Sequence, residues 1–216
     1  MNIISKCLNF LLKSFFIMCF TFSFIVLIVN FTLLFKPLYY ADINILNIEE
    51  SSNLSKADLK SNYDYVITYL TQSADEEFNL PTLPSSINGQ THFKEVKAIF
   101  DNLKIMLLFS ILISIIGIII NKRKKKFKYL LTSSIILIIM PILLLIPFII
   151  NFDKSFTTFH HIFFNNDYWL FNVDLDPIIT ILPQVFFFHC AILILSLIII
   201  ISLILRYIYR SCTKND

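Results

Sequence analysis

Four long apolar runs alternate with more polar stretches along the chain. The runs are Ser14–Phe35, Ile105–Ile120 (extended back to about Asp101), Tyr129–Asn151 and Val185–Leu205. A helix needs about 20 apolar residues to cross the hydrocarbon core of a bilayer. The first run is longer than the core of a signal peptide, and no small-residue cleavage motif follows it, so we interpret it as a retained anchor. The pattern predicts an all-α membrane protein with four transmembrane helices.

The stretch between the first two runs predicts a small, mostly helical cap. Ser55 precedes Lys56–Gln72, and Asp58 three residues later resembles a capping box. Apolar residues then recur at helical spacing, at Leu59, Tyr63, Val66, Ile67 and Leu70. Residues 74–90 have a loop-like composition. We expect Thr91 to cap the next helix, which continues without a breaker into the second apolar run.

The distribution of charge predicts the orientation in the membrane. The connection 121–128 carries six basic residues, and cytoplasmic loops are enriched in Lys and Arg. With this loop and both termini inside, the cytoplasmic segments carry eleven basic residues and one acidic residue, and the outer segments carry seven basic and fourteen acidic. The net charge of +3 therefore does not indicate nucleic-acid binding. A lipid-headgroup site is the alternative reading of the basic loop.

These patterns divide the chain into eight expected segments. They are a cytoplasmic N-terminus with the first transmembrane helix (1–36), an extracellular cap (37–100), a second transmembrane helix (101–120), a basic cytoplasmic loop (121–128), a third transmembrane helix (129–151), an aromatic extracellular segment (152–184), a fourth transmembrane helix (185–205) and a cytoplasmic tail (206–216).

The four cysteines predict no disulfide framework. Cys7 and Cys212 face the reducing side in this topology, and Cys19 and Cys190 are not matched in depth. Cys190 is an outer-half thiol, for which we weigh a nucleophilic role against a buried packing role and favour packing.

The second outer stretch is unusually aromatic and contains two adjacent histidines. From Phe152 to Phe188 there are 11 aromatic residues. If 156–164 is helical, one face collects Phe156, Phe159, His160, Phe163 and Phe164, with His161 off its flank. Partial desolvation among these rings should lower the pKa of His160. A hydrogen-bonded core histidine is the structural alternative.

His92 is the other histidine whose position points to chemistry. It follows Thr91, so we expect it in the first turn of a helix, where the partial positive charge disfavours the imidazolium form. A neutral imidazole is what a general base requires. A surface histidine near a cap is the structural alternative, and His189 is interpreted as a packing or interface residue.

Several common chemistries have no signature here. Adjacent His160 and His161 diverge on a helix, and neither an H-x-x-x-H pattern nor a paired-cysteine pattern occurs, so we expect no metal site and no cofactor. The nucleophile elbow G-x-S-x-G and a phosphate-binding glycine loop are also missing from the sequence.

A set of short fragments gives the chain a family resemblance. They are Tyr63 through Tyr69-Leu70, Leu80-Pro81, His92-Phe93 with Val96-Lys97, Phe159-His160 with Phe163-Phe164, Trp169, and Leu182-Pro183 with Phe186-Phe187. In this order, on a four-crossing frame, the chain resembles the bacterial lipoprotein intramolecular transacylases. It departs from the pattern at Glu95, where Asp is more usual, and at His161, which duplicates His160.

The resemblance implies a reaction, partners and a site. In a diacylglyceryl-modified lipoprotein, the acyl chain on the glycerol sn-2 oxygen would move to the amine of the N-terminal cysteine, giving the lyso form in a bacterial cell membrane. The family's two catalytic histidines map onto His92 and His160. The substrate would be lined by Phe93, Phe159, Phe163, Phe164, Trp169 and Tyr63, and the oxyanion candidates are Asn88, Gln90, Asn165 and Asn166. Lipoproteins and membrane lipids are the expected partners.

Two other classes compete with an enzyme. The first is a non-enzymatic partner or chaperone subunit whose cap is an interaction surface. The second is a channel or transporter, which is disfavoured because the third and fourth apolar runs carry no charged residue before Arg206.

Overall fold

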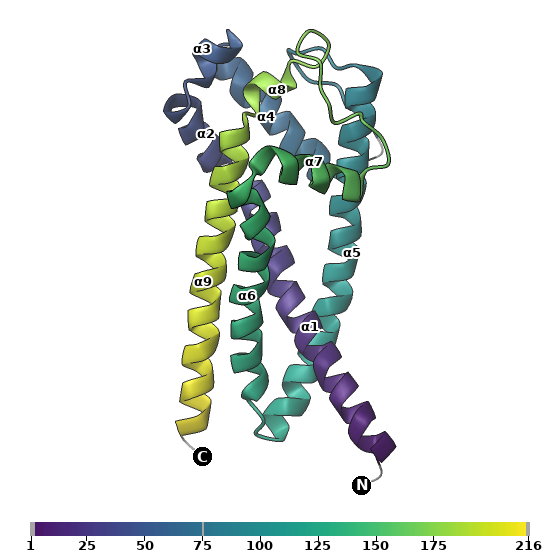
Figure 1. Cartoon of the computed structure of the whole chain (residues 1–216), viewed down its shortest axis with the longest axis vertical. Helices are drawn as coiled ribbons and strands as arrows, with labels where there is room; N and C mark the ends of the chain where they lie inside the picture. The colour runs from purple at the N-terminus through teal and green to yellow at the C-terminus, as the bar shows by residue number, and fades with distance from the viewer. Residues whose placement is uncertain (1–2, 75, 215–216) are drawn as a thin grey trace. The chain divides into compact units, whose positions relative to one another are not determined.

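The computed structural model describes residues 3–74 and 76–214, and the regular structure of these residues is helical. Residues 1–2 and 215–216 of the expected cytoplasmic segments, and residue 75 of the expected cap, lie outside the described residues. The helices are α1 (Ile3–Leu34), α2 (Lys36–Ile45), α3 (Ile48–Ser52), α4 (Lys56–Thr71), α5 (Ile87–Arg123), α6 (Lys128–Ile150), α7 (Phe152–Phe163), α8 (Ile178–Ile181) and α9 (Gln184–Lys214) (Figure 1).

Four of these helices are long and apolar enough to cross a membrane, namely α1, α5, α6 and α9. This confirms the prediction of an all-α protein with four transmembrane helices. The chain forms two compact units. The bundle unit comprises Met1–Asn30, Lys104–Pro147 and Ile194–Asp216, and the cap unit comprises Phe31–Leu103 and Phe148–Leu193.

The bundle unit is held by ring packing between α1, α5 and α6. The Tyr129 ring lies 5.1 Å from the Phe16 ring and 5.4 Å from the Phe20 ring, measured between centroids. Phe16 also fills the space beside Gly117, where a Cβ atom would overlap the phenyl ring. Any side chain at 117 would therefore push α1 away from α5.

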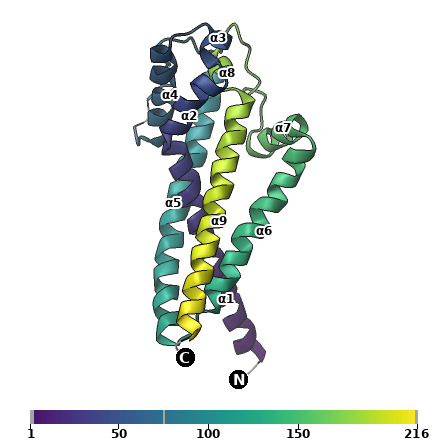
Figure 2. The ribbon, with the colours of Figure 1, turned by 90° about the vertical axis from the view of Figure 1, so that its left-hand side faces the viewer.

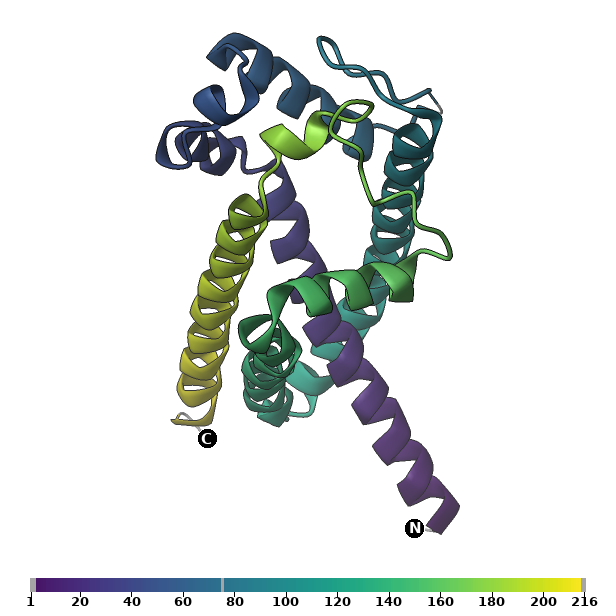
Figure 3. The same cartoon turned by 45° about the horizontal axis from the view of Figure 1, so that its top comes forward.

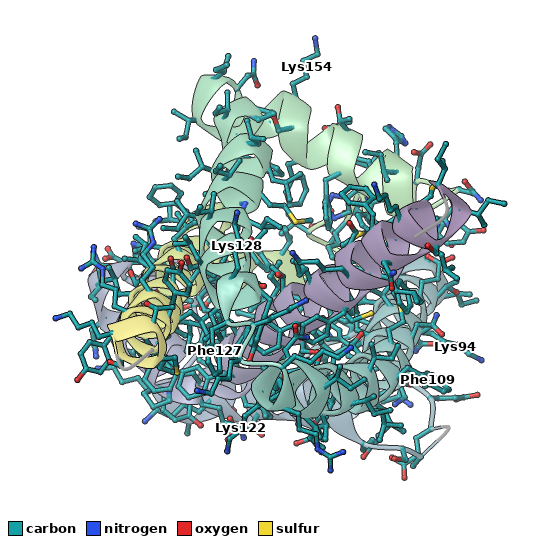
Figure 4. The ribbon with its side chains drawn as sticks, turned by 90° about the horizontal axis from the view of Figure 1, so that it is seen from below. Lys94, Phe109, Lys122, Phe127, Lys128 and Lys154 are labelled. Atoms are coloured by element: carbon teal, nitrogen blue, oxygen red, sulfur yellow. The ribbon has the colours of Figure 1, made fainter. Side chains whose placement is uncertain are left out.

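The connection between α5 and α6 contains the basic loop. Lys122, Phe127 and Lys128 lie at this connection (Figure 4). Lys122 and Arg123 occupy the last turn of α5, where positive side chains interact favourably with the partial negative charge of a helix C-terminus. The loop charges thus also stabilise the helix end that precedes them.

The cap unit has its own apolar core, and α4 supplies much of it. Leu59, Tyr63, Val66, Ile67 and Leu70 are all buried, as the helical stripe predicted. The helix begins as expected, because Ser55 Oγ accepts a hydrogen bond from the Asp58 N–H at 3.2 Å. Helices α2 and α3 pack with α4 and α8 in this unit (Figure 2).

A hydrogen bond between a histidine and a buried carboxylate connects α9 to α2 within the cap unit. Asp42 is 1% exposed, and His189 Nδ1 lies 2.9 Å from both of its carboxylate oxygens. Since a carboxylate only accepts, His189 Nδ1–H is the donor. The structure thus gives His189 a specific electrostatic partner, beyond the packing role that the sequence suggested.

The start of α5 corrects the expectation for Thr91. The helix begins at Ile87, so Thr91 lies inside it and donates its hydroxyl to the Ile87 carbonyl at 2.7 Å. Ser86 Oγ instead accepts the Gly89 N–H at 3.0 Å, in the way an N-cap does. Residues 87–90 are consequently helical rather than loop, and His92 lies in the second turn.

Candidate functional site

Helices α5 and α7 of the cap unit bring His92 and His160 together. Helix α7 runs from the end of α6 toward the first turns of α5 (Figure 3). The two imidazole rings are 6.0 Å apart between centroids, at an angle of 35°. Both side chains are buried, whereas His161 on the flank of α7 is exposed. Two histidines that are distant in the sequence therefore form one pair.

The ring of His160 is fixed in orientation and in tautomer. Its Nδ1–H donates to the Phe156 carbonyl one turn earlier in α7, at 2.7 Å. The ring stacks on Trp169 with centroids 4.6 Å apart. With Nδ1 carrying the hydrogen, the neutral ring has its lone pair on Nε2. His160 is therefore prepared to accept a proton at Nε2.

His92 is enclosed by aromatic rings. The Phe164 ring lies 4.8 Å and the Phe171 ring 5.5 Å from the His92 ring, both edge-on. Burial, and secondarily the charge of His160, lower the pKa of His92 to about 4. This cause differs from the helix N-terminus invoked from the sequence, because the dipole effect fades beyond the first turn.

Burial also lowers the pKa of His160, although its hydrogen bond to the Phe156 carbonyl acts in the opposite direction. The Nδ1 atom of His92 is buried and has no hydrogen-bond partner within the described residues. Buried polar atoms are normally satisfied. His92 therefore presents an unpaired imidazole nitrogen within the aromatic enclosure, next to the second imidazole.

A carboxylate holds the start of α5 against the segment that follows α7. Asp176 accepts from the Ser86 N–H at 2.8 Å and from the Ser86 hydroxyl at 2.7 Å. A Cβ atom at Gly89 would overlap Asp176 Oδ1, so the close approach needs glycine there. A negative charge at a helix N-terminus is favourable. This contact helps fix the position of the His92 turn.

The aromatic residues expected to line the substrate fall into three groups. Phe164 and Trp169 are buried against the histidine pair, and Phe93 is buried beside His92, stacked on Phe78 with centroids 4.1 Å apart. Phe159 and Phe163 lie on α7 with exposed rings. Tyr63 lies in the cap core, stacked on Tyr39 at 3.9 Å.

The four expected oxyanion donors also differ in their surroundings. Asn88 and Asn165 are exposed. Gln90 donates to the Asn79 side chain at 3.3 Å. Asn166 donates its amide to Glu95 Oε1 at 2.8 Å. Of the four, Asn166 has the most direct link to the histidine pair. Its backbone carbonyl accepts the Trp169 indole N–H at 3.1 Å, and the Trp169 ring stacks on His160.

Sequence reasoning did not find the roles of Phe171, Asp176 and Glu95. Phe171 contacts both His92 and Phe93 from a segment with no periodic pattern. Asp176 and Glu95 are single acids among the fourteen of the outer stretches. Two signals pointed to Glu95. It lies at a position of the family pattern where Asp is more usual, and its spacing of three residues from His92 places both on one helix face.

No group of three or more metal-ligating side chains occurs in the described part of the chain. The site therefore consists of two neutral imidazoles, an aromatic enclosure, one amide and nearby carboxylates. Such a set can move protons and exclude water, and these are the two requirements of acyl transfer between an ester and an amine.

Comparisons with known proteins show the family to which the chain belongs. The family model "Lipoprotein intramolecular transacylase Lit" matches residues 14–187. The structure is similar to that of the membrane integral lipoprotein intramolecular transacylase Lit from Bacillus cereus. The TM-score is 0.91 with 40% identity, over 97% of this chain and 98% of that chain.

Two further Bacillus cereus Lit structures, each with one histidine replaced, by arginine or by alanine, give a TM-score of 0.89 at 39% identity. They are matched over 98% of this chain and over 95% and 96% of theirs. No curated protein matches the chain. The chain belongs to the lipoprotein intramolecular transacylase family, and it is a membrane-integral acyltransferase.

Proposed function

We propose that the enzyme moves the sn-2 acyl chain of a diacylglyceryl-modified lipoprotein to the α-amine of its N-terminal cysteine, with His92 and His160 as the catalytic pair. The observation that carries the proposal is the 6.0 Å separation of the two buried imidazoles. A single tetrahedral carbon between the rings would be within about 3 Å of a nitrogen on either side.

The proposed roles follow from the tautomer of His160. The amine nitrogen attacks the ester carbonyl carbon, and Nε2 of His160 takes a proton from that nitrogen. An N–H of neutral His92 donates to the developing oxyanion. The bond from the carbonyl carbon to the sn-2 oxygen then breaks, and the proton held by His160 passes to that oxygen. The products are an amide and a free sn-2 hydroxyl.

Proximity supplies much of the expected rate. The amine and the ester belong to one molecule, so correct positioning contributes up to about 7–11 kcal/mol. General acid–base catalysis adds about 10²- to 10⁴-fold. The buried rings of Phe164 and Trp169 would keep water from the carbonyl, which suppresses hydrolysis.

We place the reaction at the outer face of a bacterial cell membrane, with residues 37–100 and 152–184 outside and both termini in the cytoplasm. The charge distribution supports this orientation, because the 121–128 loop holds six basic residues.

The test is expression in a bacterium that lacks N-acylation of its lipoproteins, with the N-terminal lipopeptides analysed by mass spectrometry. We expect N-acyl, S-monoacylglyceryl cysteine from the intact chain. In His92→Ala and His160→Ala, the rate should fall by about 10²-fold or more. The matched control is His161→Ala, which removes an exposed neighbouring imidazole and should retain most of the product.

The same measurement can contradict the proposal. An unchanged product from the variant lacking both His92 and His160 would exclude them as catalysts. Loss of product in His161→Ala, with normal expression, would transfer the role to that histidine. Absence of product from the intact chain would favour the partner-protein alternative.

A further inference from the structure

Glu95 presents a buried carboxylate oxygen about one helical turn from His92 in α5. It follows His92 by three residues in α5, so the two side chains lie on the same face, one turn apart. Its Oε1 accepts a hydrogen bond from the Asn166 amide at 2.8 Å. Its Oε2 is buried and has no hydrogen-bond partner within the described residues.

Within the described residues, no basic side chain supplies a donor to Glu95 Oε2. Lys97, two residues further along α5, is engaged elsewhere, with the Gln72 carbonyl and with Asp101 at 3.4 Å. Lys94 is exposed. A carboxylate oxygen removed from water without a donor is costly. Its retention in this position therefore indicates that a donor arrives from outside the chain.

The carboxylate is linked by hydrogen bonds to the segment that packs on the His160 ring. Through Asn166 it is joined to the segment whose Trp169 stacks on His160 at 4.6 Å. The Asn166 carbonyl accepts the Trp169 indole N–H at 3.1 Å. Glu95 thus belongs to the same helix as His92 and is tied to the packing of His160. A donor bound at Oε2 would be held next to the pair.

We propose that Glu95 Oε2 binds the α-ammonium group of the substrate's N-terminal cysteine; this inference rests on the proposed function. The ammonium carries three N–H donors and a positive charge, and a charge-assisted hydrogen bond to a carboxylate is about twice as strong as a neutral one. The ammonium releases one proton to the solvent, and the resulting free amine keeps a hydrogen bond to Glu95 while its lone pair attacks the ester. The proton that the nitrogen then loses is the one that His160 takes and passes to the sn-2 oxygen.

This contact also determines which lipids are accepted. A lipoprotein whose amine is already acylated has no charged group for Glu95, and neither does a simple ester lipid without an amine. Both would lose the charge-assisted contact and bind more weakly. The site would then select diacylglyceryl cysteine with a free N-terminus over the ester lipids that surround it in the membrane.

The test uses unreactive ligands, so that binding is measured apart from catalysis. A lipopeptide with ether links in place of esters is prepared with a free amine and, as its match, with an acetylated amine. Dissociation constants are measured for the full chain in nanodiscs. We expect the wild-type protein to bind the free amine on the order of 10-fold or more tightly than the acetylated form.

The informative variant is Glu95→Gln, because glutamine keeps an Oε1 acceptor for Asn166 while removing the charge. It should abolish the preference for the free amine and leave the affinity for the acetylated lipopeptide unchanged. Glu95→Asp should retain part of the preference. Equal weakening of both ligands, or an unaltered preference, would overturn the proposal.

His92→Ala separates this inference from the proposed function. The variant should lose acyl transfer and keep the preference for the free amine. If His92→Ala abolishes the preference and Glu95→Gln does not, the amine is bound by the imidazole and the Glu95 assignment is wrong. If the preference follows Glu95 while both histidines prove dispensable for the product, only the catalytic proposal fails.

Discussion

Burial keeps both imidazoles of the site neutral, but their other neighbours differ. His92 is surrounded by rings that disfavour a charge, and its pKa is lowered to about 4. His160 is also desolvated, but the Phe156 carbonyl favours its charged form. His160 is therefore the better proton acceptor of the two, and His92 the better neutral hydrogen-bond donor.

The protonation of His92 can be measured by NMR of ¹³C-labelled histidine in nanodiscs, with His92→Gln to assign its signal. We expect a midpoint well below 6.5, near 4. Because the folded pKa is the lower one, the unfolded chain binds the proton first as the pH falls. The free energy of unfolding should then decrease from about pH 6.5 downward, with the loss complete below about pH 4.

The variant His160→Ala, which removes the neighbouring imidazole, is the internal control for the pKa of His92. In His160→Ala the midpoint of His92 should move upward, because part of its lowering comes from His160. A midpoint at or above 6.5 in the intact protein would contradict the buried, neutral state of His92.

For the site residues, the sequence predicted the two histidines and some of the rings around them, including Phe164 and Trp169, but it did not predict Phe171. Helical phase distinguished His160 from His161, since the apolar positions around 160 repeat with the helical period. Phe171, and the contact of Asn166 with Glu95, come from an irregular segment, where no period exists to show which side chains turn inward.

Among the elements, α5 differed most from its expected form at its start. The Pro and Ser content of residues 81–86 indicated a loop, and Thr91 was the expected cap, but Ser86 serves because the distant Asp176 fixes it. Boundaries set by a contact across 90 residues are not visible in local sequence. By contrast, α4 was predicted well, because its N-cap and its apolar face are both encoded by residues close together in the sequence.

The contact between α2 and α9 should be a main source of stability in the cap unit. His189→Ala would leave the buried Asp42 carboxylate without this hydrogen-bond donor, at a cost of about 1–3 kcal/mol in the free energy of unfolding. Thermal unfolding in detergent should show a lower midpoint. His161→Ala, at an exposed position, should leave it unchanged.

A double variant shows whether an unpaired charge or lost packing causes the loss of stability in His189→Ala. Combining His189→Ala with Asp42→Asn removes the unpaired charge, so much of the lost stability should return. If the double variant is as unstable as His189→Ala alone, lost packing rather than charge burial explains the effect.

At the scale of the whole molecule, the apolar runs defined the four long helices because hydropathy over about 20 residues is a strong signal. The orientation rests on charge, and the cap position on that orientation. The packing of the helices does not determine which end of the bundle faces the cytoplasm, because an apolar helix can cross the bilayer in either direction.

Orientation is tested by labelling single cysteines, in a chain whose native cysteines are replaced by serine, with a membrane-impermeant maleimide. Ser73→Cys and Lys124→Cys are both at exposed positions. In intact cells, we expect Ser73→Cys to be labelled and Lys124→Cys to be protected until the membrane is permeabilised. The reverse pattern would invert the proposed topology.

The hydrogen bond from His160 to the Phe156 carbonyl lies within one turn of α7, and this has a consequence for control of the enzyme. The reactive lone pair owes its place to helical backbone geometry and not to a partner carboxylate. Loosening that single turn would let the hydrogen migrate to the other nitrogen and silence the base. Under the proposed mechanism, the rate of acyl transfer should therefore depend on how well this short helix is ordered.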